Sequence, residues 1–243
     1  MKTLTFARRC AKEILRDPLN VAFGLGFPVV LILLLSAIQA NIPVALFAIE
    51  RLAPGISVFG LSFLTLFSAT LVARDRESAL LQRLYTTPLK PWDFILGYLL
   101  PMLPIALGQS AACYLVSILL GLPVTVNIGL AMVLLLPMAV FYLSLGLLCG
   151  SVLNVKQVGG ICGALLTNLS AWLSGVWFDL DLVGGVFRKI ANTLPFVHGV
   201  ELERCAIAGD WGGLLPRLLP VTAYALAALI CAVWLFLRQM KRQ

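Results

Sequence analysis

The chain has 243 residues, of which 60% are hydrophobic and 12% are charged, and its formal net charge is +7. Soluble domains carry about 25% charged residues, so this composition excludes an ordinary soluble domain and predicts a polytopic membrane protein. We expect an all-α integral membrane fold, because backbone groups in lipid must be hydrogen-bonded within each segment. We expect this fold to form one transmembrane domain over residues 1–243.

Residues 1–19 form the first predicted element, an amphipathic helix that lies in the membrane interface. Apolar residues at helical spacing share much of one face: Leu4, Phe6, Cys10, Ile14 and Leu15. Basic residues occupy the other faces: Arg8, Arg9, Lys12 and Arg16. The alternative is a solvated basic leader, which would not need an apolar face.

Six apolar segments follow, and each reaches the roughly 20 residues that a helix needs to cross a bilayer. They are residues 20–40, 53–73, 92–120, 126–153, 157–178 and 214–237. With these spans, 13 of the 18 Lys and Arg residues fall on the side of the two termini. The positive-inside rule then places both termini in the cytoplasm of a plasma-membrane protein. The basic excess also indicates contact with anionic membrane lipid, and we expect no nucleic-acid partner.

A charged segment, residues 74–91, separates the second and third spans. An apolar stripe at helical spacing predicts a helix over residues 75–87: Leu80, Leu81, Leu84 and Tyr85. Pro88 ends this helix, because the residue before a proline is disfavoured in the helical region. A simple connector would be shorter and would not need the stripe. The stripe is therefore expected to bury against either a neighbouring helix or a soluble partner, and the sequence leaves both open.

Residues 179–216 are predicted to form a helical or re-entrant hairpin on the extracytoplasmic side. The segment is too polar to span a membrane and too apolar to be a free loop. Within it, residues 197–208 predict a short helix that Gly209 closes. Two neighbouring carboxylates, Asp179 and Asp181, are interpreted as a hydrated helix end.

No nucleotide-binding or catalytic motif is visible in the sequence. It contains no G-x-x-x-x-G-K-[ST] motif, and its single histidine, His198, has no visible partners for a metal site or a catalytic triad. The predicted spans are almost free of ionisable residues, which argues against a carrier driven by protons or sodium. If the protein moves a substrate, its energy is expected to come from elsewhere, and the apolar spans favour an apolar or amphiphilic substrate.

Three segments resemble ABC-2 type permeases, the membrane subunits of many ATP-binding cassette exporters. In chain order they are ILRDPL, ARDRESALLQRLYTTPLKPWDFILGYLL and LSGVWFDLDL…LPFVHGVELERCAIAGD. Their order and spacing extend the resemblance over essentially the whole chain, with the same six-helix topology. One departure lies at Asp179 and Asp181, where many relatives have a proline-bearing turn.

The resemblance implies that residues 74–91 contain the coupling helix, which sits in a groove of a separate cytoplasmic ATPase subunit. The residues implied in this contact are Arg74, Asp75, Arg76, Glu77, Leu80, Leu84 and Pro88. The ATPase subunits would bind ATP and magnesium, so this chain would hold no cofactor and no ATPase site. The implied assembly contains two ATPases and two permeases, the second permease being identical or a relative.

The leading hypothesis is therefore a permease subunit that exports a drug, lipid or lipopeptide. One alternative is an integral membrane enzyme acting on lipid, which would need clustered catalytic residues at an interface. The other is a membrane scaffold that transports nothing. The effect of the chain on ATP hydrolysis by a partner ATPase distinguishes these hypotheses.

Overall fold

The computed structural model describes residues 2–18, 22–43, 46–78 and 91–240, and these residues form helices without any strand. Five helical stretches in this part of the chain are long and apolar enough to cross a membrane: Ala22–Gln39, Ile49–Glu77, Trp92–Leu119, Asn127–Val152 and Trp211–Gln239. They correspond to five of the six predicted spans. The prediction of a multi-pass helical membrane protein is therefore confirmed, and the count of six spans is not.

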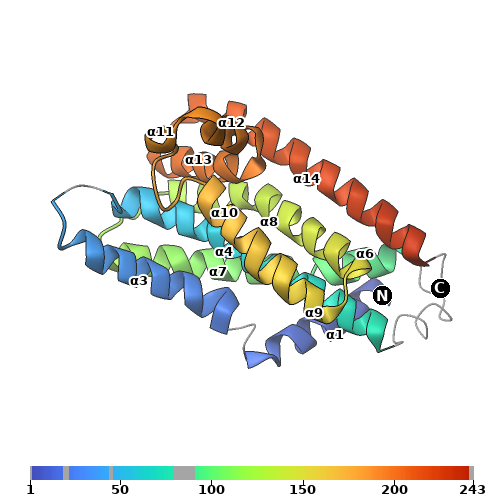
Figure 1. The fold of residues 1–243 in the computed structure, drawn as a ribbon. Coiled ribbons are helices and arrows are strands. Elements are labelled where there is room, and N and C mark those ends of the chain that lie inside the picture. The colour runs from blue at the N-terminus through green and yellow to red at the C-terminus, as the bar shows by residue number, and fades with distance from the viewer. Residues whose placement is uncertain (1, 19–21, 44–45, 79–90, 241–243) are drawn as a thin grey trace.

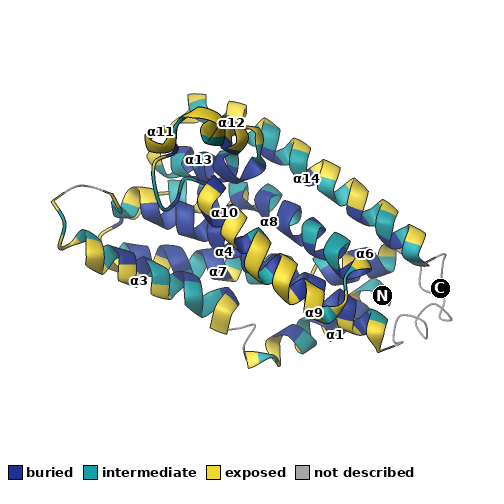
Figure 2. Cartoon of the chain, in the orientation of Figure 1, coloured by how far each residue is buried: buried dark blue, intermediate teal, exposed yellow. Residues whose placement is uncertain are grey.

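Helix α4 (Ile49–Glu77) is the central helix of the bundle, and 89% of its most apolar stretch is buried. Helices α7 (Met102–Leu119) and α8 (Asn127–Val152) pack against it (Figure 1). Figure 2 shows α4 largely buried, whereas exposed and partly buried residues make up most of α3 (Phe27–Gln39) and α14 (Trp211–Met240). The two outer helices therefore present apolar surface away from the core, as lipid-facing helices do.

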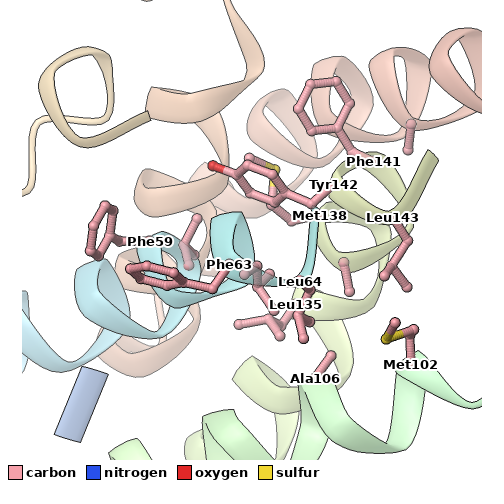
Figure 3. Close-up of a cluster of buried hydrophobic side chains, with 14 of the residues drawn as sticks. Phe59, Phe63, Leu64, Met102, Ala106, Leu135, Met138, Phe141, Tyr142 and Leu143 are labelled. Carbon is pink, nitrogen blue, oxygen red and sulfur yellow. The ribbon is translucent and has the colours of Figure 1, made fainter. Parts of the chain in front are cut away.

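Large side chains from α4, α7 and α8 interdigitate in the middle of the bundle (Figure 3). The rings of Phe59 and Phe63 pack edge to face with their centroids 5.7 Å apart. Gly146 and Gly150 of α8 allow α4 to approach closely, because a Cβ atom at Gly150 would lie 2.6 Å from the carbonyl oxygen of Ala69. Dispersion contacts of this kind replace the hydrophobic effect as the main source of packing energy between helices in lipid.

Helix α1 (Lys2–Leu15) forms where the amphipathic helix was predicted, but its apolar face is divided between two environments. Phe6, Cys10 and Ile14 are buried against the rest of the chain. The Phe6 ring packs on α6 (Pro91–Leu99), which is the first part of the third predicted span. Leu4 and Leu15, which were assigned to the same apolar face, remain 72% and 61% exposed.

The predicted fifth span, residues 157–178, is the one that has no counterpart among the five apolar helices. It is built instead from α9 (Val155–Val158), the π-helix η2 (Gly159–Leu166) and α10 (Thr167–Leu173), which follow one another without a gap. The helical stretch ends at Leu173, and Gly175 adopts a positive φ of 69° just beyond it. A positive φ is easy for glycine and ends the helix earlier than the hydropathy pattern predicts.

The bundle has two distinct ends (Figure 1). We call the end with α1, α6 and the last turns of α14 the terminal end, and the other the opposite end. At the opposite end lie α11 (Leu180–Val183), α12 (Gly185–Thr193) and α13 (Pro195–Ala208). Gly209 closes α13 in the left-handed conformation at φ 72°, which agrees with the stop predicted there.

Candidate functional site

Helix α4 does not stop at Ala73, where the second span was predicted to end, but continues through Glu77. Four residues that the sequence assigned to a separate coupling helix therefore form the last turn of a membrane-crossing helix. Three of them bind other parts of the chain. We call this set, together with two partners from α1 and α6, the α4 junction: Arg9, Asp75, Arg76, Glu77 and Tyr98.

Asp75 is the buried centre of the α4 junction, with only 2% of its side chain exposed. Both terminal nitrogens of Arg9 donate to its carboxylate, at 2.5 and 2.6 Å, in a bidentate pair. The hydroxyl of Tyr98 donates to the same carboxylate at 2.8 Å. The hydrogen bonds to Asp75 raise the pKa of Arg9 above its ordinary value, so the guanidinium stays charged. Asp75 therefore joins α1, α4 and α6 at one point.

Arg76 and Glu77 bind the turn between α8 and α9. The Arg76 guanidinium donates to the carbonyl oxygen of Ser151 and, at 2.6 Å, to that of Leu153. A cation at these carbonyls satisfies and neutralises the negative end of the α8 dipole. The Glu77 carboxylate accepts a hydrogen bond from the amide nitrogen of Val155 at 2.9 Å, on the other side of the turn. Arg76 and Glu77 thus tie the end of α4 to both sides of the α8–α9 turn.

The other predicted site residues lie outside these contacts. Arg74 is 53% exposed, and its one ion pair among the described residues is a loose one with Asp17 at 3.6 Å. Three of the four basic residues assigned to the interfacial helix are exposed and accessible to solvent or lipid: Arg8, Lys12 and Arg16. Leu80, Leu84 and Pro88 lie outside the described residues.

Sequence reasoning missed the internal partners of the junction. Tyr98 sits in an apolar run, and nothing in its sequence context indicates that its hydroxyl reaches Asp75. The carbonyl oxygens and the amide nitrogen of the α8–α9 turn carry no sequence signal at all. The capping-box pattern of Asn154 and Gln157 does predict the start of α9. It fixes the turn to which Arg76 and Glu77 are hydrogen-bonded.

The opposite end holds a cavity of about 580 Å³ between α4, the α10–α11 connection, α12, α13 and α14. Its charged lining comprises four arginines and three carboxylates: Arg51, Arg188, Arg204, Arg217, Asp179, Asp181 and Glu201. Arg204 pairs with Glu201 at 2.8 Å and Arg188 with Asp181 at 2.9 Å. Asp179 accepts a hydrogen bond from the amide nitrogen of Asp181 and begins α11, a separate short helix, whereas the sequence placed it at the end of the fifth span. This volume lies in the range of small-molecule sites.

Among the described residues, no group of three or more His, Cys, Asp or Glu side chains could hold a metal ion. The six cysteines are not joined in disulfides. The described site is therefore a set of charged helix contacts at one end and a charged cavity at the other.

The family model described as ABC-2 type transporter matches residues 1–206, which include α1, the α4 junction and most of α13. No curated protein matches the chain.

Proposed function

Because the chain belongs to the ABC-2 type transporter family, we propose that it is the permease subunit of an exporter driven by separate ATPase subunits. The family match over residues 1–206 is the observation that carries this proposal. In this assignment the ATPase subunits bind ATP and magnesium, and the permease holds no cofactor. Two permeases, identical or related, work with two ATPases.

We place the protein in the plasma membrane with six spans and both termini in the cytoplasm. The span that brings the count to six is the fifth in chain order, the continuous helical stretch α9–η2–α10, which covers residues 155–173. At the α-helical rise, nineteen residues extend at most about 28 Å, close to the roughly 30 Å of a hydrocarbon core. This arrangement puts the α4 junction on the cytoplasmic side and α11–α13 outside, as the distribution of Lys and Arg favours.

We propose that the exported substrate is an apolar or amphiphilic molecule such as a drug, lipid or lipopeptide. The exposed surface of α3 and α14 is apolar along much of its length, with Leu33, Leu34, Leu226 and Ile230 each more than 40% exposed. A substrate that dissolves in lipid can reach such helices from the bilayer. The charged cavity beside α13 offers polar groups for the headgroup of an amphiphile.

We assign the ATPase contact to residues 74–91, and we include Leu80, Leu84 and Pro88 in it, as the resemblance implies. Asp75 is buried, so its role is to fix α1 and α6 to α4 and not to touch the partner. Arg76 and Glu77 pass the motion of this segment to the α8–α9 turn. ATP-driven closure of the two ATPases would then move the spans as rigid bodies.

A hydrolysis assay in liposomes tests this proposal. The complex with its partner ATPase should hydrolyse ATP at a rate that depends on the permease. Replacing both Glu77 and Leu84 with alanine should reduce this dependence by about 5-fold or more, the lower range of allosteric coupling. The control is Lys156→Ala, because Lys156 is exposed near the same turn and its side chain makes no hydrogen bond or ion pair within the described part of the chain.

Two results would redirect the assignment. An ATPase whose turnover ignores the wild-type chain would favour the membrane scaffold, and lipid turnover without any ATPase would favour the membrane enzyme. If the wild-type chain does change turnover but the double variant behaves like Lys156→Ala, the permease assignment stands and the coupling role of residues 74–91 fails.

A further inference from the structure

One buried carboxyl group lies outside the α4 junction and serves no purpose in the proposed function. Glu203 of α13 is 1% exposed and lies in the segment that was predicted to form a helical or re-entrant hairpin on the extracytoplasmic side. Its Oε2 accepts a hydrogen bond from the hydroxyl of Tyr114 on α7 at 2.7 Å. Its Oε1 is buried and has no hydrogen-bond partner among the described residues.

The surroundings of Glu203 disfavour a negative charge. An ionised carboxylate buried without a cation is among the most costly groups in a protein, and such a group takes up a proton instead. Burial raises the pKa of Glu203 to about 8, and the Tyr114 hydroxyl opposes this rise only in part. At neutral pH the carboxyl is therefore mostly uncharged in this conformation.

Other titratable groups near α13 do not supply the missing charge. Arg204, which follows Glu203 in the chain, pairs with Glu201, and Arg217 also approaches Glu201. The charged groups that α4, α12, α13, α14 and the loop after α13 bring to this end line the two cavities beside α13: Glu50, Arg51, Arg188, Glu201, Arg204, Asp210 and Arg217. His198 of α13 contacts the Asn192 carbonyl, and Tyr224 of α14 donates to the Thr193 carbonyl. On α8, the Tyr142 hydroxyl donates to the Ser170 hydroxyl. On α7, the titratable residue next to Tyr114 is Cys113, which is not a cation.

We propose that Glu203 is a proton-binding site, protonated while α13 packs against Tyr114 and ionised when α13 moves away from α7. On separation the carboxyl O–H bond breaks and the proton passes to water, and the reverse step takes a proton up again. The neighbouring residues Arg204 and Cys205 already line an open cavity of about 380 Å³. Successive residues on a helix are about 100° apart, so a rotation of α13 by about 100° would bring Glu203 to the place that Arg204 now holds beside that cavity.

This inference goes beyond the proposed function, because proton binding by Glu203 does not require an ATPase or a substrate. It makes the movement of α13 depend on the pH of the solution that reaches the opposite end. High pH favours the separated state and low pH the packed one. The proposal can therefore be tested on the purified chain alone.

Infrared titration of the full chain in lipid nanodiscs tests the site directly. The wild type should show the band of a protonated carboxyl at neutral pH. As the pH is raised, this band should disappear with a midpoint at pH about 8. Glu203→Gln, which keeps the shape and can still accept from Tyr114, should lack this band. Glu201→Gln, a change two residues away in a partly exposed ion pair, should keep it. A band that survives in Glu203→Gln, or its absence from the wild type at neutral pH, would overturn the proposal.

A second variant keeps the test decisive if Glu203→Gln fails to fold. Tyr114→Phe removes the one donor to the carboxylate and keeps the burial, so the midpoint should move to higher pH. An unmoved midpoint, or a shift to lower pH, would contradict the assignment of the band to Glu203.

Thermal unfolding gives an independent measure. Because the folded pKa lies above the unfolded value, the contribution of Glu203 to stability is complete below the unfolded pKa of about 4.5 and is lost as pH rises to about 8. The melting temperature of the wild type should fall over this range relative to that of Glu203→Gln. Parallel curves for the two proteins would count against the site.

Discussion

Replacing Arg9 with methionine is expected to destabilise the folded chain by about 3–5 kcal/mol, the usual cost of removing one partner from a buried ion pair. The reason is the burial of Asp75, which would keep the Tyr98 hydroxyl as its one donor among the contacts seen here. Unfolding of the purified chain in detergent, followed by helical circular dichroism, measures the loss.

Two further variants show whether the ion pair itself is responsible. Arg8→Met changes an exposed neighbour on the same helix, so its effect should stay within about 0.5 kcal/mol. Adding Asp75→Leu to Arg9→Met removes the unpaired charge and should restore most of the lost stability. If Arg9→Met and Arg8→Met have equal effects, Asp75 does not depend on its arginine.

Replacing Gly150 with valine is expected to disrupt the contact between α4 and α8. The new Cβ atom would lie 2.6 Å from the carbonyl oxygen of Ala69 and 2.8 Å from the Cβ of Val72. The first of these is a backbone atom and cannot turn aside, so the two helices must separate. We expect a loss of about 3 kcal/mol or more, at the upper end of overpacking costs.

The matched control for Gly150→Val is Gly129→Val on the same helix, where no atom lies within 4 Å of the added Cβ. Its effect should stay within about 1 kcal/mol, since glycine and valine differ by less than that in helix propensity. Unfolding temperature and the monodisperse fraction in size-exclusion chromatography report both variants. Equal behaviour of the two would mean that α4 and α8 do not depend on close approach at Gly150.

Hydropathy was sufficient to predict the helices that cross the bundle, because each is a long apolar run between charged or proline-containing segments. It failed at residues 157–178, where the helical stretch begins at Val155 and ends at Leu173. Hydropathy averages composition and does not report the π-helical backbone of η2 or the positive φ of Gly175.

The charged residues show a different limit. The sequence predicts that Arg74–Glu77 belong to a separate cytoplasmic segment, because charged residues normally end a membrane span. They continue α4 because Asp75, Arg76 and Glu77 each find a partner more than 20 residues away in the chain. The burial of Glu203 was not predicted, because a helix that carries several charged residues is expected to be exposed. Its contact with Tyr114 joins two segments that are distant in the sequence. Pairings between distant segments have no signature in a single sequence.

The central claim is that the α4 junction transmits the motion of the ATPases to the opposite end of the permease. Native Cys205 reports that end, because it is 7% exposed and lines the cavity beside α13. The measurement is labelling of Cys205 by a membrane-impermeant maleimide, with and without ATP, in the complex with the partner ATPase. Peptide mass spectrometry reads this cysteine separately from the other five.

ATP should change the labelling rate of Cys205 in the wild type and in the Lys156→Ala control. In Arg76→Ala/Glu77→Ala, which releases the α8–α9 turn, the complex should still assemble and hydrolyse ATP but the labelling rate should no longer respond. An ATP response of wild-type size in that double variant would contradict the account.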